Sequence, residues 1–95
     1  MLNLIKEKIK RGKIKDFAID LKDEEIYGFY FEDGTKLIVN FSFRLRTLNC
    51  HFSVNLGYEK IFESINPFKK FFFRSFVREK IKELFKKELK LNGTE

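Results

Sequence analysis

The spacing of apolar residues changes from helical to strand-like near Gly12. Before that glycine the apolar side chains recur every three or four positions, at Leu2, Ile5 and Ile9. Beyond it they alternate with polar residues, at Phe17, Ile19 and Leu21. Because glycine often follows the last residue of a helix, the pattern predicts a basic helix over residues 1–12. It also predicts an antiparallel sheet over residues 13–57.

Residues 26–43 predict a β-hairpin whose turn contains Glu32-Asp33-Gly34. A two-residue Asp-Gly loop would bring Phe31 beside Lys36 and mix apolar and polar side chains on both faces. A three-residue loop, with Gly34 in a left-handed bulge, instead makes one face continuously apolar. We therefore predict the three-residue loop, with an apolar face formed by Tyr27, Phe29, Phe31, Leu37, Val39, Phe41 and Phe43.

The next strand carries its apolar residues at even positions, whereas the strand before it carries them at odd positions. The even set consists of Leu48, Cys50, Phe52, Val54 and Leu56. Run straight, residues 35–56 would extend about 70 Å, which exceeds the width of a domain of this size. The chain must therefore turn sharply near Leu45, although neither Gly nor Pro marks that place.

Helical spacing returns after Gly57, and Asn66-Pro67 interrupts it. The apolar residues before the interruption are Tyr58, Ile61, Phe62 and Ile65. Asn is a preferred residue at the N-cap of a helix, and Pro is well tolerated at the first helical position. We predict a helical region over residues 58–91 with a break at Asn66-Pro67, and a tail over residues 92–95. The chain is then one α+β domain, residues 1–95, in which C-terminal helices pack on one face of a four-stranded antiparallel meander.

The long C-terminal helix has apolar residues on more sides than one sheet can cover. One set comprises Phe68, Phe71, Phe72 and Phe76, and we expect it to pack on the sheet. The other set comprises Phe73, Val77, Ile81, Leu84 and Phe85, and we predict that it forms a homodimer interface. Contact with the N-terminal helix is the second choice. A membrane surface is the third and is unlikely, because Glu79, Glu83 and Glu88 lie near lysines, as on an ordinary solvated helix.

Composition and charge narrow the functional classes. The 95 residues are 43% hydrophobic and 36% charged, which is typical of a folded domain, and the net charge is +6. The charge is uneven, because residues 1–15 carry six Lys or Arg and one acid, whereas residues 16–35 carry one Lys and seven acids. Such a basic excess attracts nucleic acid, anionic membranes or acidic proteins. No apolar stretch approaches the ~18 residues of a membrane span, so we expect a cytoplasmic protein.

The residues that could carry catalysis are few. One cysteine cannot form an internal disulfide, and one cysteine with one histidine supplies too few ligands for zinc. Cys50 and His51 are neighbours in a strand, so their side chains point to opposite faces and cannot form a nucleophile–base pair. No general base has an orienting partner. The sequence thus predicts no metal, no cofactor and no enzymatic activity.

The polar face of the sheet is the candidate binding site. It offers uncharged hydrogen-bonding side chains with a basic rim, which suits single-stranded DNA or RNA, with Tyr30 or His51 stacking a base. The predicted contacts are Lys8, Lys10, Arg11, Lys13, Tyr30, Lys36, Asn40, Arg44, Arg46, Asn49, His51 and Asn55. The alternative explanation is structural, because any half-buried antiparallel sheet has a polar face toward water.

The predicted order of elements, strands over residues 13–56 and then a long helix, is similar to that of the ββββα modules of Whirly and Pur-alpha type single-strand binders. Those modules assemble through their helices, but the likeness is one of element order and no residue motif is shared. The rival function is a protein-interaction module, such as a viral or mobile-element inhibitor of a host nucleic-acid-handling complex. In that case the acidic residues 23–25 and 32–33 would imitate phosphates toward a basic partner.

Overall fold

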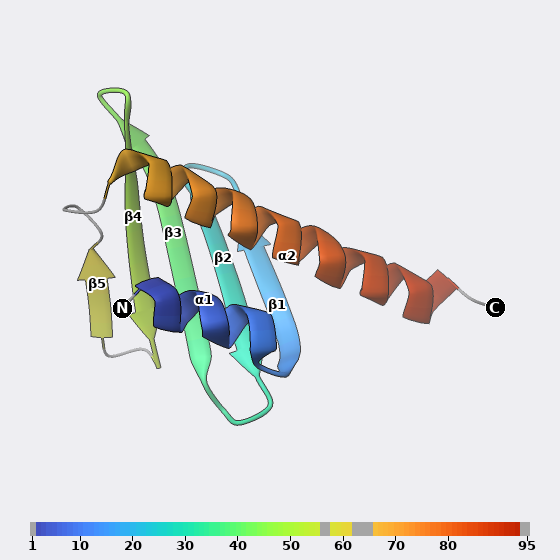
Figure 1. Cartoon of the computed structure of the whole chain (residues 1–95). Helices are drawn as coiled ribbons and strands as arrows, with labels where there is room; N and C mark the ends of the chain where they lie inside the picture. The colour runs from blue at the N-terminus through green and yellow to red at the C-terminus, as the bar shows by residue number, and fades with distance from the viewer. Residues whose placement is uncertain (1, 56–57, 62–65, 94–95) are drawn as a thin grey trace.

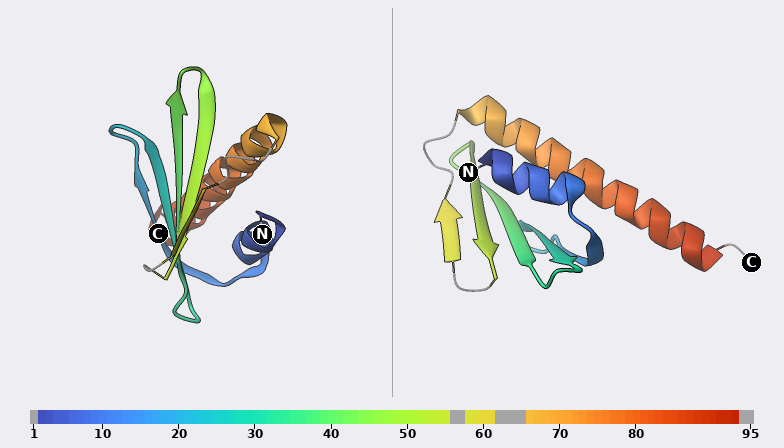
Figure 2. Two further views of the ribbon diagram at one scale, coloured as in Figure 1. Left: turned by 90° about the vertical axis from the view of Figure 1, so that its left-hand side faces the viewer. Right: turned by 60° about the horizontal axis from the view of Figure 1, so that its bottom comes forward.

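The structure, a computed structural model, describes residues 2–55, 58–61 and 66–93 as two helices and one antiparallel sheet (Figure 1). The elements are α1 (Leu2–Arg11), β1 (Ile14–Asp20), β2 (Glu25–Phe31), β3 (Lys36–Arg44), β4 (Thr47–Val54), β5 (Tyr58–Ile61) and α2 (Pro67–Gly93). The strand order is β1-β2-β3-β4-β5, so each strand pairs with its neighbours in sequence. Both helices lie on the same face of the sheet (Figure 2). The predicted α+β meander is confirmed, and a fifth short strand extends it.

The hydrophobic core lies between the sheet and the two helices. Most apolar side chains of β2, β3 and β4 that face the helices are almost fully buried, and α1 and α2 form the other side of the core. The buried residues are Ile5, Ile9, Tyr27, Phe29, Phe31, Leu37, Val39, Phe41, Leu48, Cys50, Phe52, Phe73, Val77 and Ile81. Because side chains alternate along a strand, the same pleat that buries these residues directs their neighbours to the opposite, helix-free face.

The hairpin between β2 and β3 has the predicted three-residue loop. Phe29 pairs with Leu37 and Tyr27 with Val39, as the continuous apolar face requires. The amide of Phe31 donates to the carbonyl of Thr35 at 2.9 Å, which closes the loop. Gly34 has a φ of 90°, a conformation that side chains disfavour. The sequence therefore predicted both the register and the residue that makes the turn possible.

The sharp turn near Leu45 is a two-residue hairpin connection. Arg44 pairs with Thr47, and Leu45 and Arg46 between them have φ values of 50° and 65°. Two positive φ angles define the tight turn that matches strand twist, and Asn-Gly normally occupies it. A bulky residue held in this region costs on the order of 1–3 kcal/mol. The turn reverses the chain and so accounts for the change from odd to even apolar positions.

The prediction that a helix begins at Tyr58 is wrong, because residues 58–61 form β5. Ile61 pairs with His51 and Tyr58 with Val54, so β5 satisfies backbone groups on the edge of β4. Phe62 and Ile65 lie outside the described residues. The interruption at Asn66-Pro67 is confirmed as the start of α2, since Asn66 Oδ1 accepts a hydrogen bond from the amide of Phe68 at 2.8 Å.

The C-terminal boundary also differs from the prediction. The helix α2 continues to Gly93, two residues beyond the predicted end at Leu91. Residues 92 and 93 are therefore helical rather than part of a tail, while residues 94 and 95 lie outside the described residues.

The predicted faces of α2 are reversed in the structure except at Phe76, which is half-buried against the core. Phe73, Val77 and Ile81 are buried in the core, whereas Phe68 and Phe72 are exposed. Leu84 packs against the core, and Phe85 makes an edge-to-face contact with Phe17 at 5.1 Å between ring centroids. The prediction that Phe73, Val77, Ile81, Leu84 and Phe85 form a dimer interface is therefore wrong for Phe73, Val77 and Ile81, which are buried, whereas Phe85 is 44% exposed. These side chains face the sheet and α1 of their own chain, because the helices lie side by side.

Candidate nucleic-acid interface

The face of the sheet opposite the helices (Figure 2) carries half of the twelve predicted nucleic-acid contacts: Tyr30, Lys36, Asn40, Arg44, Asn49 and His51. The register pairs Asn40 with His51 and Ser42 with Asn49, so these four side chains form two adjacent rows on one surface. All four are partly exposed. The structure thus brings Asn40, Asn49 and His51 together as predicted, on the two central strands β3 and β4.

Strand β3 gives this surface a simple charge pattern. Its residues with the same side-chain direction are Lys36, Ile38, Asn40, Ser42 and Arg44. Lys36 and Arg44 lie at the two ends of the strand, eight residues and therefore about 26 Å apart. Between them the side chains are uncharged. We call the surface formed by Lys36, Asn40, Ser42 and Arg44 of β3 and Thr47, Asn49, His51 and Ser53 of β4 the open face.

Tyr30 borders the open face on β2. It pairs with Lys36, whose Nζ lies 5.2 Å from the centroid of the tyrosine ring. The ring reaches back over Gly28, because a Cβ added to that glycine would lie 3.5 Å from the Tyr30 hydroxyl. It would also lie 3.3 Å from Cδ1 of Ile38. Glycine at this position therefore makes room for the aromatic ring. A glycine within a strand is a sequence signal of such a close approach.

The β1 side of the same surface is acidic. Asp16 pairs with Tyr30 and Asp20 with Ile26, which places both carboxylates beyond β2 on this surface. Glu24, in the turn between β1 and β2, accepts a hydrogen bond from Nδ2 of Asn40 at 2.9 Å. This contact joins residues 16 positions apart and could not be predicted from the strand pattern. An anionic strand would consequently be confined to β3 and β4.

Asn55 has a structural role instead of the predicted binding role. Its φ is 54°, and its Oδ1 accepts a hydrogen bond from the amide of Lys36 at 2.9 Å. Its own amide donates to the carbonyl of Lys36 at 2.8 Å. The side chain therefore fastens the end of β4 to β3 and is not directed at a ligand.

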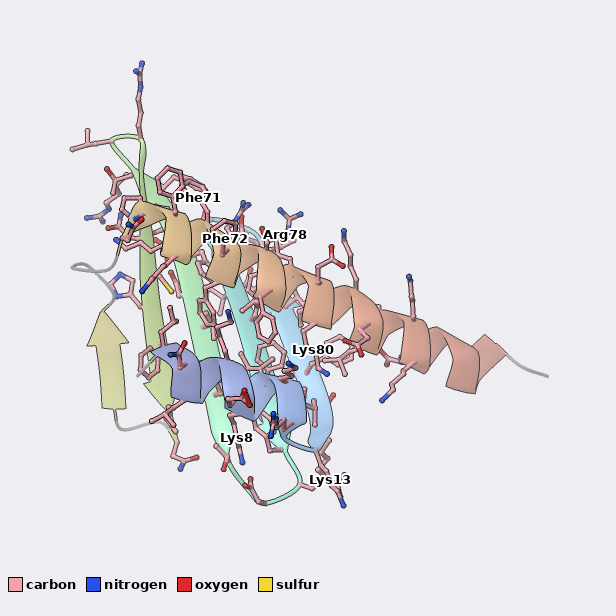
Figure 3. All side chains as sticks on the ribbon, in the orientation of Figure 1. Lys8, Lys13, Phe71, Phe72, Arg78 and Lys80 are labelled. Atoms are coloured by element: carbon pink, nitrogen blue, oxygen red, sulfur yellow. The ribbon has the colours of Figure 1, made fainter. Side chains whose placement is uncertain are left out.

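The basic residues of the N-terminal segment lie away from the open face. Lys8, Lys10 and Arg11 belong to α1, which covers the opposite side of the sheet (Figure 3). Lys8 forms an ion pair with Asp33 and lies 4.8 Å from the ring centroid of Phe31. Arg11 pairs with Glu7 at 2.9 Å.

The prediction that these residues form the rim of the same site is therefore wrong. Lys13, in the connection from α1 to β1, accepts a hydrogen bond at its carbonyl from Glu32 and lies toward the β2–β3 hairpin (Figure 3). The basic residues Lys8, Lys10, Arg11 and Lys13 and the open face thus form two separate surfaces.

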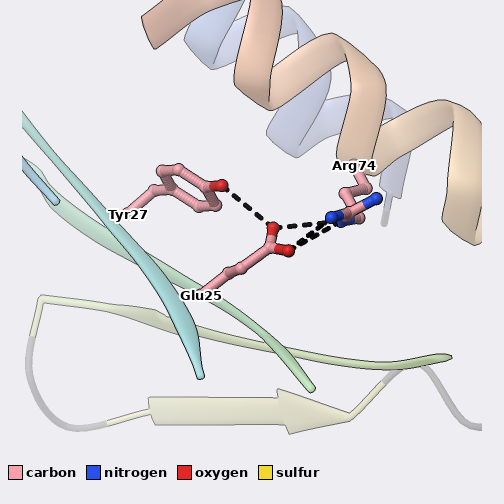
Figure 4. Close-up of polar contacts among 3 residues, drawn as sticks. All are labelled: Glu25, Tyr27 and Arg74. Carbon is pink, nitrogen blue, oxygen red and sulfur yellow. Dashed lines mark hydrogen bonds and ion pairs between the residues drawn. The ribbon is translucent and has the colours of Figure 1, made fainter. Parts of the chain in front are cut away.

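The side chain of Arg74 is used to fix α2 on the sheet. It forms an ion pair with Glu25, whose Oε1 also accepts a hydrogen bond from the Tyr27 hydroxyl at 2.9 Å (Figure 4). The hydrogen bond from Arg74 lowers the pKa of Glu25, with burial opposing it. Burial, with a smaller contribution from Glu25, raises the pKa of Tyr27 to about 12. This cluster is half-buried, whereas Arg44 and Arg46, at the β3–β4 hairpin, are exposed.

The structure offers no catalytic pair at Cys50 and His51. Cys50 is buried in the core, whereas His51 lies on the opposite face. Burial raises the pKa of the Cys50 thiol to about 12, so the thiol stays protonated. Within residues 2–55, 58–61 and 66–93 no three His, Cys, Asp or Glu side chains come close enough together to hold a metal ion. Nor does any helix of this part of the chain have the length and hydrophobicity to cross a membrane.

The two acidic segments lie at opposite ends of β2. Residues 23 and 24 precede this strand, Glu25 is its first residue, and residues 32–33 follow it. Glu25 is paired with Arg74 and Asp33 with Lys8, and the bond from Lys8 lowers the pKa of Asp33. The segments therefore do not form one surface that could imitate a row of phosphates.

Comparisons with protein families, curated proteins and solved structures find no match to this chain. The function of the open face must therefore be argued from its own geometry.

Proposed function

We propose that this protein binds single-stranded nucleic acid, DNA or RNA, along β3 and β4 on the open face. The observation that carries the proposal is the row of uncharged side chains, Ile38, Asn40 and Ser42, between Lys36 and Arg44, which are about 26 Å apart. Phosphates would contact the two cations, and bases would lie over the neutral side chains between them. A span of this length suits the shorter single-strand sites, of about four nucleotides.

The chemistry of the open face supports base contacts. Asn40, Asn49 and Ser42 present hydrogen-bond donors and acceptors in adjacent rows, as the edges of unstacked bases require. Tyr30 supplies an aromatic ring beside Lys36, so a stacked base and a contacted phosphate would be neighbours. We place this activity in the cytoplasm, because the one cysteine is a buried free thiol and suits a reducing compartment.

The first test is the salt dependence of oligonucleotide binding by the double variant Lys36→Gln, Arg44→Gln. Each phosphate contact with a single strand contributes about 0.7 to the slope of log affinity against log salt. We therefore expect the variant to bind more weakly and its slope to be smaller by about 1.4. Fluorescence anisotropy of a labelled oligonucleotide, titrated between about 50 and 200 mM salt, measures both quantities.

The matched control is the double variant Lys10→Gln, Lys86→Gln, which removes the same charge from exposed positions on the two helices. It should retain the slope of the unmodified protein. Equal losses in both variants would mean that net charge attracts the oligonucleotide and would contradict the open face. Absence of any salt-dependent binding by the unmodified protein would refute the proposed function.

A second test separates stacking from charge at Tyr30. Tyr30→Leu removes the ring but keeps an apolar side chain over Gly28, so the sheet should remain stable. Loss of one stacked base costs about 1–3 kcal/mol, which is at least about a fivefold rise in Kd. Tyr30→Phe keeps the ring and should change Kd by less than about twofold. Equal Kd values for the two variants would exclude Tyr30 from the site.

A further inference from the structure

One end of the molecule exposes a group of large apolar side chains that the core does not use. The group comprises Phe43 and Leu45 of the β3–β4 hairpin and Phe68, Phe71 and Phe72 of the first turns of α2. Phe43 and Phe71 join the two elements, with 6.2 Å between their ring centroids. The exposed fractions of Leu45, Phe68 and Phe72 are 98%, 73% and 68%. Exposed apolar groups gathered on neighbouring elements of a small protein indicate a contact surface.

The backbone at the tip of the β3–β4 hairpin is strained. Leu45 and Arg46 both have positive φ angles, where Asn and Gly are the favoured residues. Leu45 gains no burial in return, because its side chain is almost fully exposed. Strained residues of this type recur at functional sites. A leucine in this turn is therefore better explained by something outside the domain than by folding.

The β3–β4 hairpin and the first turns of α2 carry basic residues and no acidic ones. Residues 43–47 and 67–78 contain six Lys or Arg and no Asp or Glu. Lys69 and Lys70 lie in the first turn of α2, where positive side chains oppose the helix dipole. Of the six cations Arg74 is paired with Glu25, and Lys70 is buried. Arg44, Arg46, Lys69 and Arg78 are exposed.

Charge and shape together select the occupant of this surface. A symmetric contact with a second copy would bring each basic patch against an identical one, which is repulsive. Stacking with bases would leave Leu45 without a role, since it has neither a ring nor a polar group. A protein of fixed shape would need a separate pocket for each projecting side chain. A fluid bilayer accepts projecting apolar groups, and its anionic headgroups attract the surrounding cations.

We propose that this aromatic–basic end, formed by residues 43–46 and the first turns of α2, docks on an anionic lipid bilayer. Leu45, Phe68 and Phe72 enter the boundary between headgroups and acyl chains. The cations at the headgroup level are Arg44, Arg46, Lys69 and Arg78. The acidic turn between β1 and β2 lies at the same end of the sheet, and its repulsion favours an approach with α2 and the hairpin tip foremost. The proposal is independent of nucleic-acid binding, with which it shares only Arg44.

The test uses Phe72→Trp, because the chain contains no tryptophan and the new indole is the single reporter. The variant is mixed with vesicles of phosphatidylcholine that contain about 30 mol% phosphatidylglycerol. We expect a saturable blue shift of the tryptophan emission and co-sedimentation, both reversed by about 1 M salt and absent with pure phosphatidylcholine. No blue shift with anionic vesicles, or an equal shift with neutral ones, overturns the proposal.

A second substitution separates docking from folding. Leu45→Asn in the Phe72→Trp protein should weaken the vesicle affinity about tenfold, because it removes an inserted apolar group. The same change should raise Tm by about 5 °C, since Asn tolerates a positive φ. Leu4→Gln, on α1 and outside the aromatic–basic end, removes a leucine that is 69% exposed and should leave the affinity within about twofold.

Two results would assign the surface to another occupant and refute the bilayer. An emission shift on adding an oligonucleotide, without one on adding vesicles, would make the phenylalanines part of a nucleic-acid site. A doubled mass in gel filtration that Leu45→Asn reverses would make them an interface with a second copy. Equal weakening by Leu45→Asn and Leu4→Gln would show unspecific adsorption.

Discussion

The carboxylate of Glu25 connects a strand to a helix through two different partners. It is paired with Arg74 of α2 and accepts the hydroxyl hydrogen bond of Tyr27 on its own strand (Figure 4). Arg74 lowers the pKa of Glu25 below the ordinary value of 4.5. A group whose pKa is lower in the folded state stabilises the fold above its unfolded pKa. That contribution is lost as the pH falls through the folded pKa.

We expect Glu25→Gln to lower the free energy of unfolding by about 1–2 kcal/mol at neutral pH, because a charged hydrogen bond becomes neutral. As the pH falls below about 4, the unmodified protein should lose this advantage and the two stability curves should converge. Urea denaturation at a series of pH values measures the difference. Glu79→Gln is the control, since Glu79 forms an exposed pair with Lys82 at 3.5 Å. Parallel curves for Glu25→Gln would contradict the role of the ion pair.

At the scale of elements, the adjacent residues Phe72 and Phe73 test the orientation of α2. Phe73 is 1% exposed and lies 5.7 Å from Phe41 between ring centroids, whereas Phe72 is on the outer side. Phe73→Ala should cost about 3–5 kcal/mol of stability through loss of burial and creation of a cavity. Phe72→Ala should cost less than about 0.5 kcal/mol. Equal losses in thermal or urea unfolding would mean that the helix packs by another face.

The pairing of the strands could be predicted from the sequence, because a shift of the register by one residue would exchange the apolar and polar faces. Moving the β2–β3 pairing by one position would bring Phe31 beside Lys36, and only one loop length avoids this. The start of α2 was predictable for a local reason as well, since Asn66 caps the helix through its own side chain. These features depend on residues close together in sequence.

Other features depended on distant contacts and could not be predicted. Tyr58 and Ile61 fit one helical turn and a short strand equally well, and the exposed edge of β4 decides between them. The face of α2 that becomes buried depends on the position of α1. The phenylalanines of α2 lie on several sides of the helix, so their spacing does not identify that face.

The candidate site divides in the same way between local and distant information. The alternation of Asn40, Asn49 and His51 was readable from the strands. The contact between Asn40 and Glu24 and the structural role of Asn55 both arise from the positions of separate elements. The sequence therefore predicted which residues share the open face but not which of them have partners within the fold.

At the scale of the whole molecule, the net charge of +6 does not form one basic surface. The cations of α1 lie over the covered side of the sheet, and two of them are paired with Glu7 and Asp33. The exposed Lys and Arg side chains of the β3–β4 hairpin and the start of α2 instead have apolar or uncharged polar neighbours. Both proposed surfaces therefore meet near Arg44, one on each side of the sheet.

The meander has a consequence for the order in which the chain folds. Each strand pairs with its neighbour in sequence, so every hairpin closes a short loop at little entropic cost. The helices differ, because Lys6 of α1 lies over Phe76 of α2 at 5.4 Å although 70 positions separate them. The sheet should accordingly form early and the two chain ends should dock on it late. Until they do, the phenylalanine-rich face stays open to other chains, so the rate of helix docking sets the risk of aggregation.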